Sequence, residues 1–122
     1  MNKEMIKNIP HSMSVDLATL TDYSEGRVVS RTIAQNNYLS MTLFAIDAGE
    51  GISEHTTAGD ALVHILDGKA LITIGGKPTT VEAGKAIVMP ANVPHALDAK
   101  ESFKMLLVVV KENSLVWPEK AD

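Results

Sequence analysis

Apolar and polar residues alternate along much of the chain, a pattern typical of half-buried β-strands. The clearest example is the segment 38–47, where Leu39, Met41, Leu43 and Ala45 alternate with Ser40, Thr42, Phe44 and Ile46. Successive side chains of a strand point to opposite faces, so this segment is predicted to form a strand with two distinct faces. Further strands are predicted at 27–33, 69–74, 79–82, 86–89, 93–97 and 102–110.

Turn-forming residues separate these predicted strands at the spacing expected of a small β-sandwich or barrel. Gln35–Asn37 and Gly75–Pro78 are predicted turns, and the pair Asp67-Gly68 is typical of a hairpin. The segment 102–110 is apolar at nearly every position, so we expect both of its faces to be covered.

The chain has 122 residues, enough for one domain with its own core. We predict an extended N-terminal arm at 1–13, in which Pro10 ends any helix. A single all-β domain is predicted at 14–111, followed by a polar tail at 112–122. Within the domain, the segment 14–20 fits either a short strand or one helical turn.

Composition excludes several functional classes. The net charge is −4, from 11 basic and 15 acidic side chains, and no basic patch stands out, so we expect no nucleic-acid partner. The absence of cysteine excludes disulfides, thiolate metal sites and cysteine nucleophiles. No targeting signal is recognisable, and the most apolar run, 105–110, is too short to span a bilayer. We therefore expect a cytoplasmic protein that does not bind membranes.

Two stretches of similar design each place a histidine beside a turn and a short apolar strand. In the first, a Gly-rich turn that begins at Gly49 precedes His55, which is predicted to stand at the head of a mostly apolar strand. In the second, the strand 86–89 is followed by Pro90 and then by His95. Residues far apart in sequence meet readily inside a small all-β domain, so the two histidines are candidates for one common site.

These stretches resemble the two signature motifs of the cupin superfamily. The first family motif is Gly, five residues, His, one residue, His, three or four residues, Glu, six residues, Gly. Gly49, His55 and Gly68 fall in register with it, whereas Thr57 stands in place of the second His and Ala61 in place of the Glu.

The second family motif is Gly, five residues, Pro, one residue, Gly, two residues, His, three residues, Asn. Gly84, Pro90 and His95 match it, whereas Asn92 replaces the Gly and Ala99 replaces the Asn. The resemblance implies an all-β, cupin-type double-stranded β-helix, or jelly-roll barrel, with an N-terminal extended arm.

In metal-binding cupins three His and one Glu hold a divalent ion such as iron, manganese, zinc or nickel. This chain keeps His55 and His95 of those four ligands, so the resemblance implies one weakly held ion or none. Asp60 is a candidate third ligand, although a one-residue offset points a strand side chain to the opposite face unless a bulge near Gly59 intervenes. His64 is interpreted as an outer-face residue.

Two functions stay open at this stage. The first is a pocket around His55 and His95, lined also by Thr57 and Met89, that binds a small polar metabolite and, in one version, a divalent metal. The alternative is an enzyme: a metal-dependent isomerase, lyase or decarboxylase, or one in which both histidines act as general acid and base. A pure interaction module is a third class.

Exposed apolar positions also predict a homodimer. Leu62, Leu66 and Leu71 are expected on outer faces, and exposed apolar patches usually mark interfaces. In cupins sheets commonly pair across a dimer, and an N-terminal arm can add a strand to the partner. His11, within the arm, is expected to be solvated.

Overall fold

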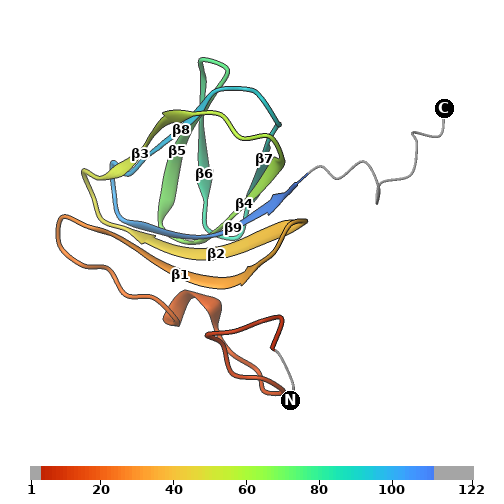
Figure 1. Cartoon of the computed structure of the whole chain (residues 1–122). Helices are drawn as coiled ribbons and strands as arrows, with labels where there is room; N and C mark the ends of the chain where they lie inside the picture. Colours follow the sequence, from red (N-terminus) through yellow and green to blue (C-terminus); the bar gives the residue numbers. More distant parts are fainter. Residues whose placement is uncertain (1–3, 112–122) are drawn as a thin grey trace.

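The computed structural model describes residues 4–111, which form a short 3-10 helix and nine strands (Figure 1). The tail at 112–122, with Trp117, lies outside the described residues. The elements are η1 (Leu17–Thr19), β1 (Val28–Gln35), β2 (Leu39–Ile46), β3 (Gly51–His55), β4 (Asp60–Asp67), β5 (Lys69–Ile74), β6 (Lys77–Glu82), β7 (Ala86–Met89), β8 (His95–Asp98) and β9 (Phe103–Val110). No helix in the described part of the chain is long and apolar enough to cross a membrane.

The strands form two antiparallel sheets that lie face to face, which confirms the predicted all-β architecture. One sheet has five strands in the order β1-β2-β9-β4-β7, and the other has four in the order β3-β8-β5-β6 (Figure 1). Apolar side chains from the inner faces of both sheets fill the space between them, including the fully buried Ile46, Val63, Ile65, Ile72 and Phe103. Burial of these side chains supplies the main stabilisation of the fold.

Strand β9 occupies the centre of the five-stranded sheet, between β2 and β4. Its inner face carries the buried Phe103 and Met105, whereas Leu106 and Val108 on its outer face are half-buried. The central position explains why the segment is apolar at every position except Lys104.

Two local predictions are wrong. Asp67-Gly68 does not close a hairpin, because β4 and β5 belong to different sheets and Gly68 forms the corner between them. Gly68 has a φ of 72° and lies so close to the carbonyl oxygen of Ser102 that no side chain would fit. His55 does not stand at the head of a strand: a turn is present at 48–49, but β3 then runs from Gly51 to His55, so that His55 ends this strand.

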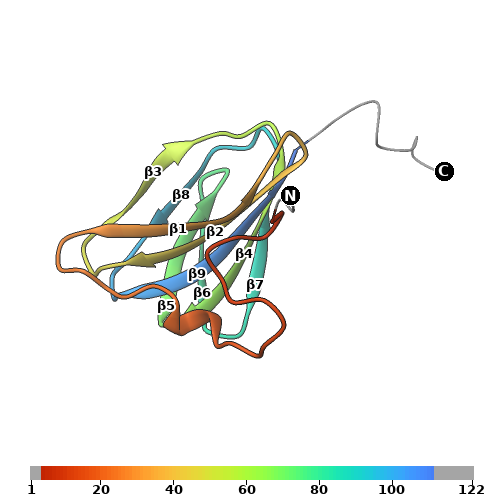
Figure 2. The ribbon, with the colours of Figure 1, turned by 60° about the horizontal axis from the view of Figure 1, so that its bottom comes forward.

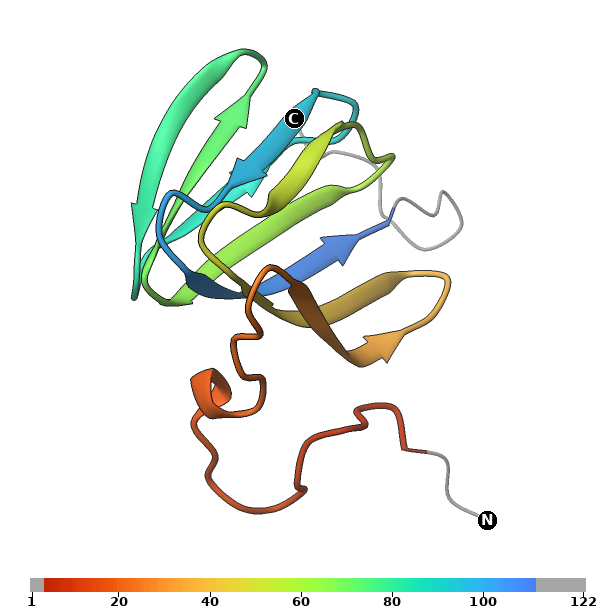
Figure 3. The same cartoon turned by 90° about the vertical axis from the view of Figure 1, so that its left-hand side faces the viewer.

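The N-terminal arm lies along its own domain. The Lys7 N–H donates to the carbonyl oxygen of Ile33 over 2.8 Å, and Asn8 Nδ2 donates to that of Thr32 over 2.7 Å. Arg31 Nη1 in turn donates to the carbonyl oxygen of Asn8 over 2.9 Å. The arm therefore runs beside β1, the edge strand of the five-stranded sheet (Figures 2 and 3).

Residues after the arm continue beneath the same sheet in the view of Figure 1. Lys104 Nζ donates to the carbonyl oxygen of Ala18 over 2.6 Å, and the Tyr23 hydroxyl donates to Asp67 Oδ2 over 2.5 Å. Burial and the neighbouring Asp67 carboxylate raise the pKa of the Tyr23 hydroxyl, so it stays protonated and able to donate. These bonds fasten η1 and its flanking residues to the ends of β4 and β9.

Candidate functional site

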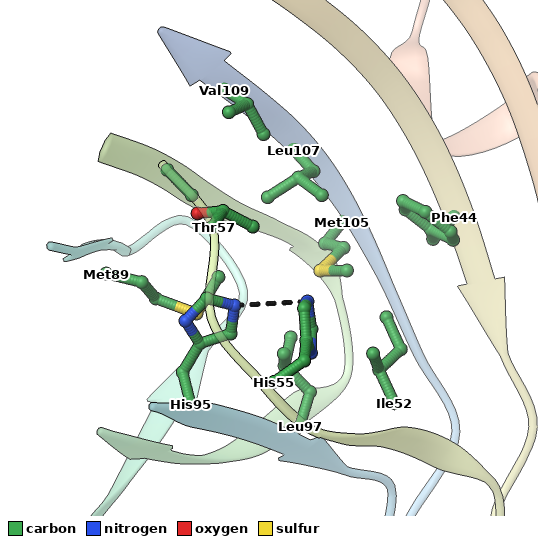
Figure 4. Close-up of a pocket in the computed structure, with 11 residues that line it drawn as sticks. Phe44, Ile52, His55, Thr57, Met89, His95, Leu97, Met105, Leu107 and Val109 are labelled. Atoms are coloured by element: carbon green, nitrogen blue, oxygen red, sulfur yellow. Dashed lines mark hydrogen bonds between the residues drawn. The ribbon is translucent and has the colours of Figure 1, made fainter. Parts of the chain in front are cut away.

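A pocket of about 320 Å³ opens between the two sheets, and both histidines line it (Figure 4). Its wall combines side chains from β2, β4, β7 and β9 of one sheet with others from β3 and β8 of the second. The lining residues are Phe44, Ile52, His55, Thr57, Ala61, Met89, His95, Leu97, Met105, Leu107 and Val109. The volume lies at the lower end of the range for small-molecule sites.

His55 and His95, 40 positions apart in sequence, are cross-strand neighbours on β3 and β8. Their Nε2 atoms are 3.3 Å apart, and the ring centroids are 4.4 Å apart with an angle of 71° between the planes (Figure 4). His95 is buried, with 2% of its surface exposed, whereas His55 lies at the exposed side of the pocket. The structure thus brings together the two residues that the sequence singled out.

A β-bulge in β3 makes this pairing possible. Ile52 pairs with Leu97 and His55 pairs with His95, so three steps along β3 match two along β8. Without the extra residue, Ile52 and His55 would point to opposite faces, because side chains alternate along a strand. With it, both side chains line the same pocket.

The hydrogen bonds of the rings define their tautomers. Nδ1 of His55 lies 2.9 Å from the carbonyl oxygen of Ser53, and Nδ1 of His95 lies 3.2 Å from that of Val93. A carbonyl oxygen only accepts hydrogen bonds, so we assign the proton of each neutral ring to Nδ1. In neutral rings with this tautomer both Nε2 atoms hold lone pairs, and the two atoms lie 3.3 Å apart at the pocket.

Burial favours the neutral form of the inner ring. Removal from solvent lowers the pKa of His95, and a positive charge on the nearby His55 would lower this pKa further. Among the described residues that line the pocket, none is Asp, Glu, Lys or Arg. The two imidazoles are thus surrounded by mostly apolar side chains.

The two replaced motif positions also face the pocket. Ala61, in place of the family Glu, is 1% exposed and lines the wall. Thr57, in place of the second His, lines it too, but its hydroxyl donates to the carbonyl oxygen of Gly59 over 2.9 Å. All four family positions therefore converge, whereas only His55 and His95 offer free donor atoms.

Asp60 does not lie in the pocket with His55 and His95. Its Oδ1 accepts a hydrogen bond of 2.8 Å from the backbone N–H of Ala91, and its side chain is not part of the pocket wall. Regular pairing of β4 with β9 at Asp60 and Ala61 leaves no bulge there, so Asp60 points to the face opposite Ala61. Among residues 4–111, no three His, Cys, Asp or Glu side chains are grouped closely enough to hold a metal ion.

The remaining histidines lie elsewhere. His64 is half-buried on the outer face of β4, beside Ala86 of β7 and Leu106 of β9. His11 is exposed in the arm, where its Nε2 lies 2.7 Å from the carbonyl oxygen of Ile6 and 3.7 Å from Glu4 Oε2.

Sequence reasoning did not single out most of the apolar lining. Phe44, Ile52, Leu97, Leu107 and Val109 alternate with residues of the opposite face, as any core positions would. Met89, proposed as a pocket residue, is 2% exposed and lines the wall. A weak signal in the sequence is the small number of bulky aromatic side chains that could fill the inner space, since the chain has only two Phe, two Tyr and one Trp.

Two antiparallel sheets with a pocket between them define a double-stranded β-helix. An RmlC-like cupin from Methanocaldococcus jannaschii with this fold superimposes with a TM-score of 0.64, at 15% identity over 74% of this chain and 87% of that one. The sequence model of a protein family described as the cupin domain matches residues 42–111. The chain belongs to the cupin family.

Two solved structures resemble almost the whole chain. A conserved protein of unknown function from Streptococcus pyogenes is 44% identical, with a TM-score of 0.88, and the match covers 91% of this chain and 97% of that protein. A cupin superfamily protein from Desulfitobacterium hafniense is 33% identical, with a TM-score of 0.84, over 88% of this chain and 98% of that one.

The donor set partly fits the metal ion that many cupins bind. At metal–nitrogen distances of about 2.0–2.1 Å, two ligands of a tetrahedral ion lie about 3.3–3.4 Å apart. The His55 and His95 Nε2 atoms are separated by 3.3 Å. The protein side chains thus offer two donors of suitable spacing, and any further ligands would be water or oxygen atoms of a bound molecule.

Proposed function

We propose that this cupin is a small-molecule-binding protein whose site is the pocket around His55 and His95. The observation that carries the proposal is the buried Nε2 of His95. The partner that the described structure gives this nitrogen is the Nε2 of His55, at 3.3 Å. At 3.3 Å this contact is long for a hydrogen bond, so a bound molecule could give this buried nitrogen a better partner than His55 does.

The second candidate is a metal-dependent enzyme, an isomerase, lyase or decarboxylase in which the ion would act as a Lewis acid. It is favoured by the 3.3 Å spacing of the two Nε2 atoms. In that case His55 and His95 would hold the ion, while the apolar wall would keep bulk water away from the bound molecule. Binding by two side chains would be weak.

One experiment separates these candidates. Protein purified without added metal is analysed by native mass spectrometry for a bound molecule and by elemental analysis for iron, manganese, zinc and nickel. Matched variants are His55→Ala, which removes an exposed pocket imidazole, and His64→Ala, which removes one from the outer face. A bound organic molecule lost only in His55→Ala supports the binding protein, whereas stoichiometric metal lost only in that variant supports the enzyme.

We also propose that the protein is a homodimer that pairs through the outer face of β4 and β7. Leu62 and Val88, which are cross-strand partners there, are 40% and 52% exposed. Leu66 lies half-buried on the same face, whereas Leu71 lies half-buried on the other sheet. Because the arm lies along its own β1, its addition to a partner's sheet is not part of this proposal.

A further inference from the structure

We propose that the ligand of this pocket is a small, mostly apolar molecule with a single hydrogen-bond-donating head group, a hydroxyl or an amino group. The inference rests on the proposed binding function and specifies its ligand class. It replaces the polar metabolite expected from the sequence with a molecule that has one polar end.

The side chains of the pocket wall favour a ligand that is mostly apolar. Of its 11 lining residues, only His55, His95 and Thr57 carry side-chain nitrogen or oxygen atoms. The Thr57 hydroxyl already donates to Gly59. A sugar or polyol would have to bury several hydroxyls without partners, which is costly. The volume of about 320 Å³ has room for roughly ten atoms the size of a water molecule.

The assigned tautomers of His55 and His95 favour a head group that donates a hydrogen bond. Because both Nδ1 atoms donate to backbone carbonyl oxygens, both Nε2 atoms present lone pairs to the pocket. A hydroxyl or amino group can donate to such a nitrogen. A carboxylate or phosphate only accepts, and no Lys or Arg lines the described pocket to pair with its charge.

The positions of the two rings orient the ligand. His95 is buried, whereas His55 lies at the exposed side, so the acceptor atoms lie along one wall formed by β3 and β8. Met105, Leu107 and Val109 of β9 line the facing wall (Figure 4). The head group is therefore expected at the histidines and the apolar body against β9.

Four probes that share one methylbenzene ring test this inference: p-cresol, p-toluidine, toluene and 4-methylbenzoate. They carry a hydroxyl, an amino group, no head group and an anionic acceptor, respectively. Each is titrated into metal-free protein at about pH 8, above the usual histidine pKa, and dissociation constants are measured by NMR. Pocket resonances identify the binding site, and histidine ¹⁵N spectra test the assigned tautomers.

We expect p-cresol, p-toluidine or both to bind at least about tenfold more tightly than toluene and 4-methylbenzoate, because a donor satisfies the buried acceptor. The preference should shrink in His55→Leu and disappear in His55→Leu/His95→Leu, while His64→Leu retains it. Comparison of p-cresol with p-toluidine separates a hydroxyl ligand from an amino ligand.

Equal binding of toluene and p-cresol, tightest binding of 4-methylbenzoate, or binding of none of the four would overturn the ligand class. So would histidine ¹⁵N spectra in which Nε2, and not Nδ1, carries the proton. A co-purifying molecule that is lost in His55→Ala would still support the broader binding function, so failure of the two proposals can be distinguished.

Discussion

The backbone N–H of Asn92 donates to the carbonyl oxygen of Thr57 over 2.8 Å. This bond ties the loop that leads into β8 to the segment that follows β3. The two chain segments that carry His95 and His55 are therefore fastened directly to each other. Asn92 makes the bond with a φ of 64°, in the left-handed region that favours Gly and tolerates Asn.

This conformation explains why the family motif has Gly at position 92 and predicts the effect of substitutions there. Asn92→Gly should change the free energy of unfolding little, because Gly adopts a positive φ without strain. Asn92→Val should lower it by about 1–2 kcal/mol, because a β-branched side chain is strained in this region. Urea unfolding of the three proteins measures the difference, and equal stability of the Val variant would contradict the assigned backbone.

The role of Asp60 can be tested in the same way. Asp60→Ala removes the acceptor of the Ala91 N–H and should lower the unfolding free energy by up to about 1 kcal/mol, since the side chain is exposed. Asp60→Asn keeps a side-chain oxygen and should stay close to the parent. Isothermal titration with Zn²⁺ should give the same affinity for all three proteins. A loss of zinc binding in Asp60→Asn at unchanged stability would instead make Asp60 a metal ligand.

Restoring the family ligands should strengthen metal binding. Ala61 and Thr57 face the same pocket as the two histidines, so Ala61→Glu and Thr57→His would add the third and fourth donors. We expect the double variant to bind Mn²⁺ or Zn²⁺ at least about tenfold more tightly than the parent, as measured by competition with a chelating dye. The control Ala96→Glu adds a carboxylate outside the pocket wall. An equal gain in that control would show that the effect is not local.

Stability should decline in mild acid because of His95. The folded protein holds the pKa of this ring below its usual value of 6.5, so the unfolded chain binds a proton more readily than the folded chain. The stability that the neutral His95 ring contributes is therefore fully present above the pKa that the ring has in the unfolded chain. It is lost as the pH falls from about 6.5 toward the lower pKa of the ring in the folded protein.

Urea midpoints at about pH 7.5 and about pH 5.5 measure this dependence. His95→Gln should show a smaller decline than the parent, and His64→Gln should behave like the parent. A parent protein that becomes more stable in acid would instead indicate that the two imidazoles share a proton between their Nε2 atoms.

The proposed dimer predicts the effect of charges on the outer face. Leu62→Glu/Val88→Glu places two carboxylates at exposed cross-strand positions and should convert a dimer to a monomer, as measured by light scattering during gel filtration. The matched control Lys77→Glu/Thr79→Glu changes exposed residues of β6 on the other sheet. A parent that is monomeric at all concentrations, or a dimer unaffected by the first pair, would rule out this interface.

Sequence pattern was sufficient to predict most of the strands. The segments 38–47 and 102–110 alternate or remain apolar as the strands β2 and β9 require, and β5 and β7 were predicted at their observed bounds. The hairpin predicted at Asp67-Gly68 was wrong because a corner between sheets and a hairpin both need a residue with positive φ. Only the tertiary pairing distinguishes the two.

The site could be predicted only in part. Motif spacing pointed to His55 and His95, but not to the bulge in β3 that turns His55 inward, because an extra residue leaves no mark in a short polar segment. The expectation for Asp60 depended on a bulge near Gly59, whereas the register at Asp60 and Ala61 is regular. The apolar character of the pocket emerges only when the inner positions of both sheets are assembled.

The placement of the arm has a consequence for self-association. Lys7 and Asn8 occupy hydrogen-bonding groups of Thr32 and Ile33 that β1 would otherwise offer to solvent. An unpaired outermost strand is a template onto which further molecules can add, one after another. Because the arm covers these groups, we expect open-ended growth into fibrils to be disfavoured at this edge, which leaves the proposed dimer to form through side chains of β4 and β7.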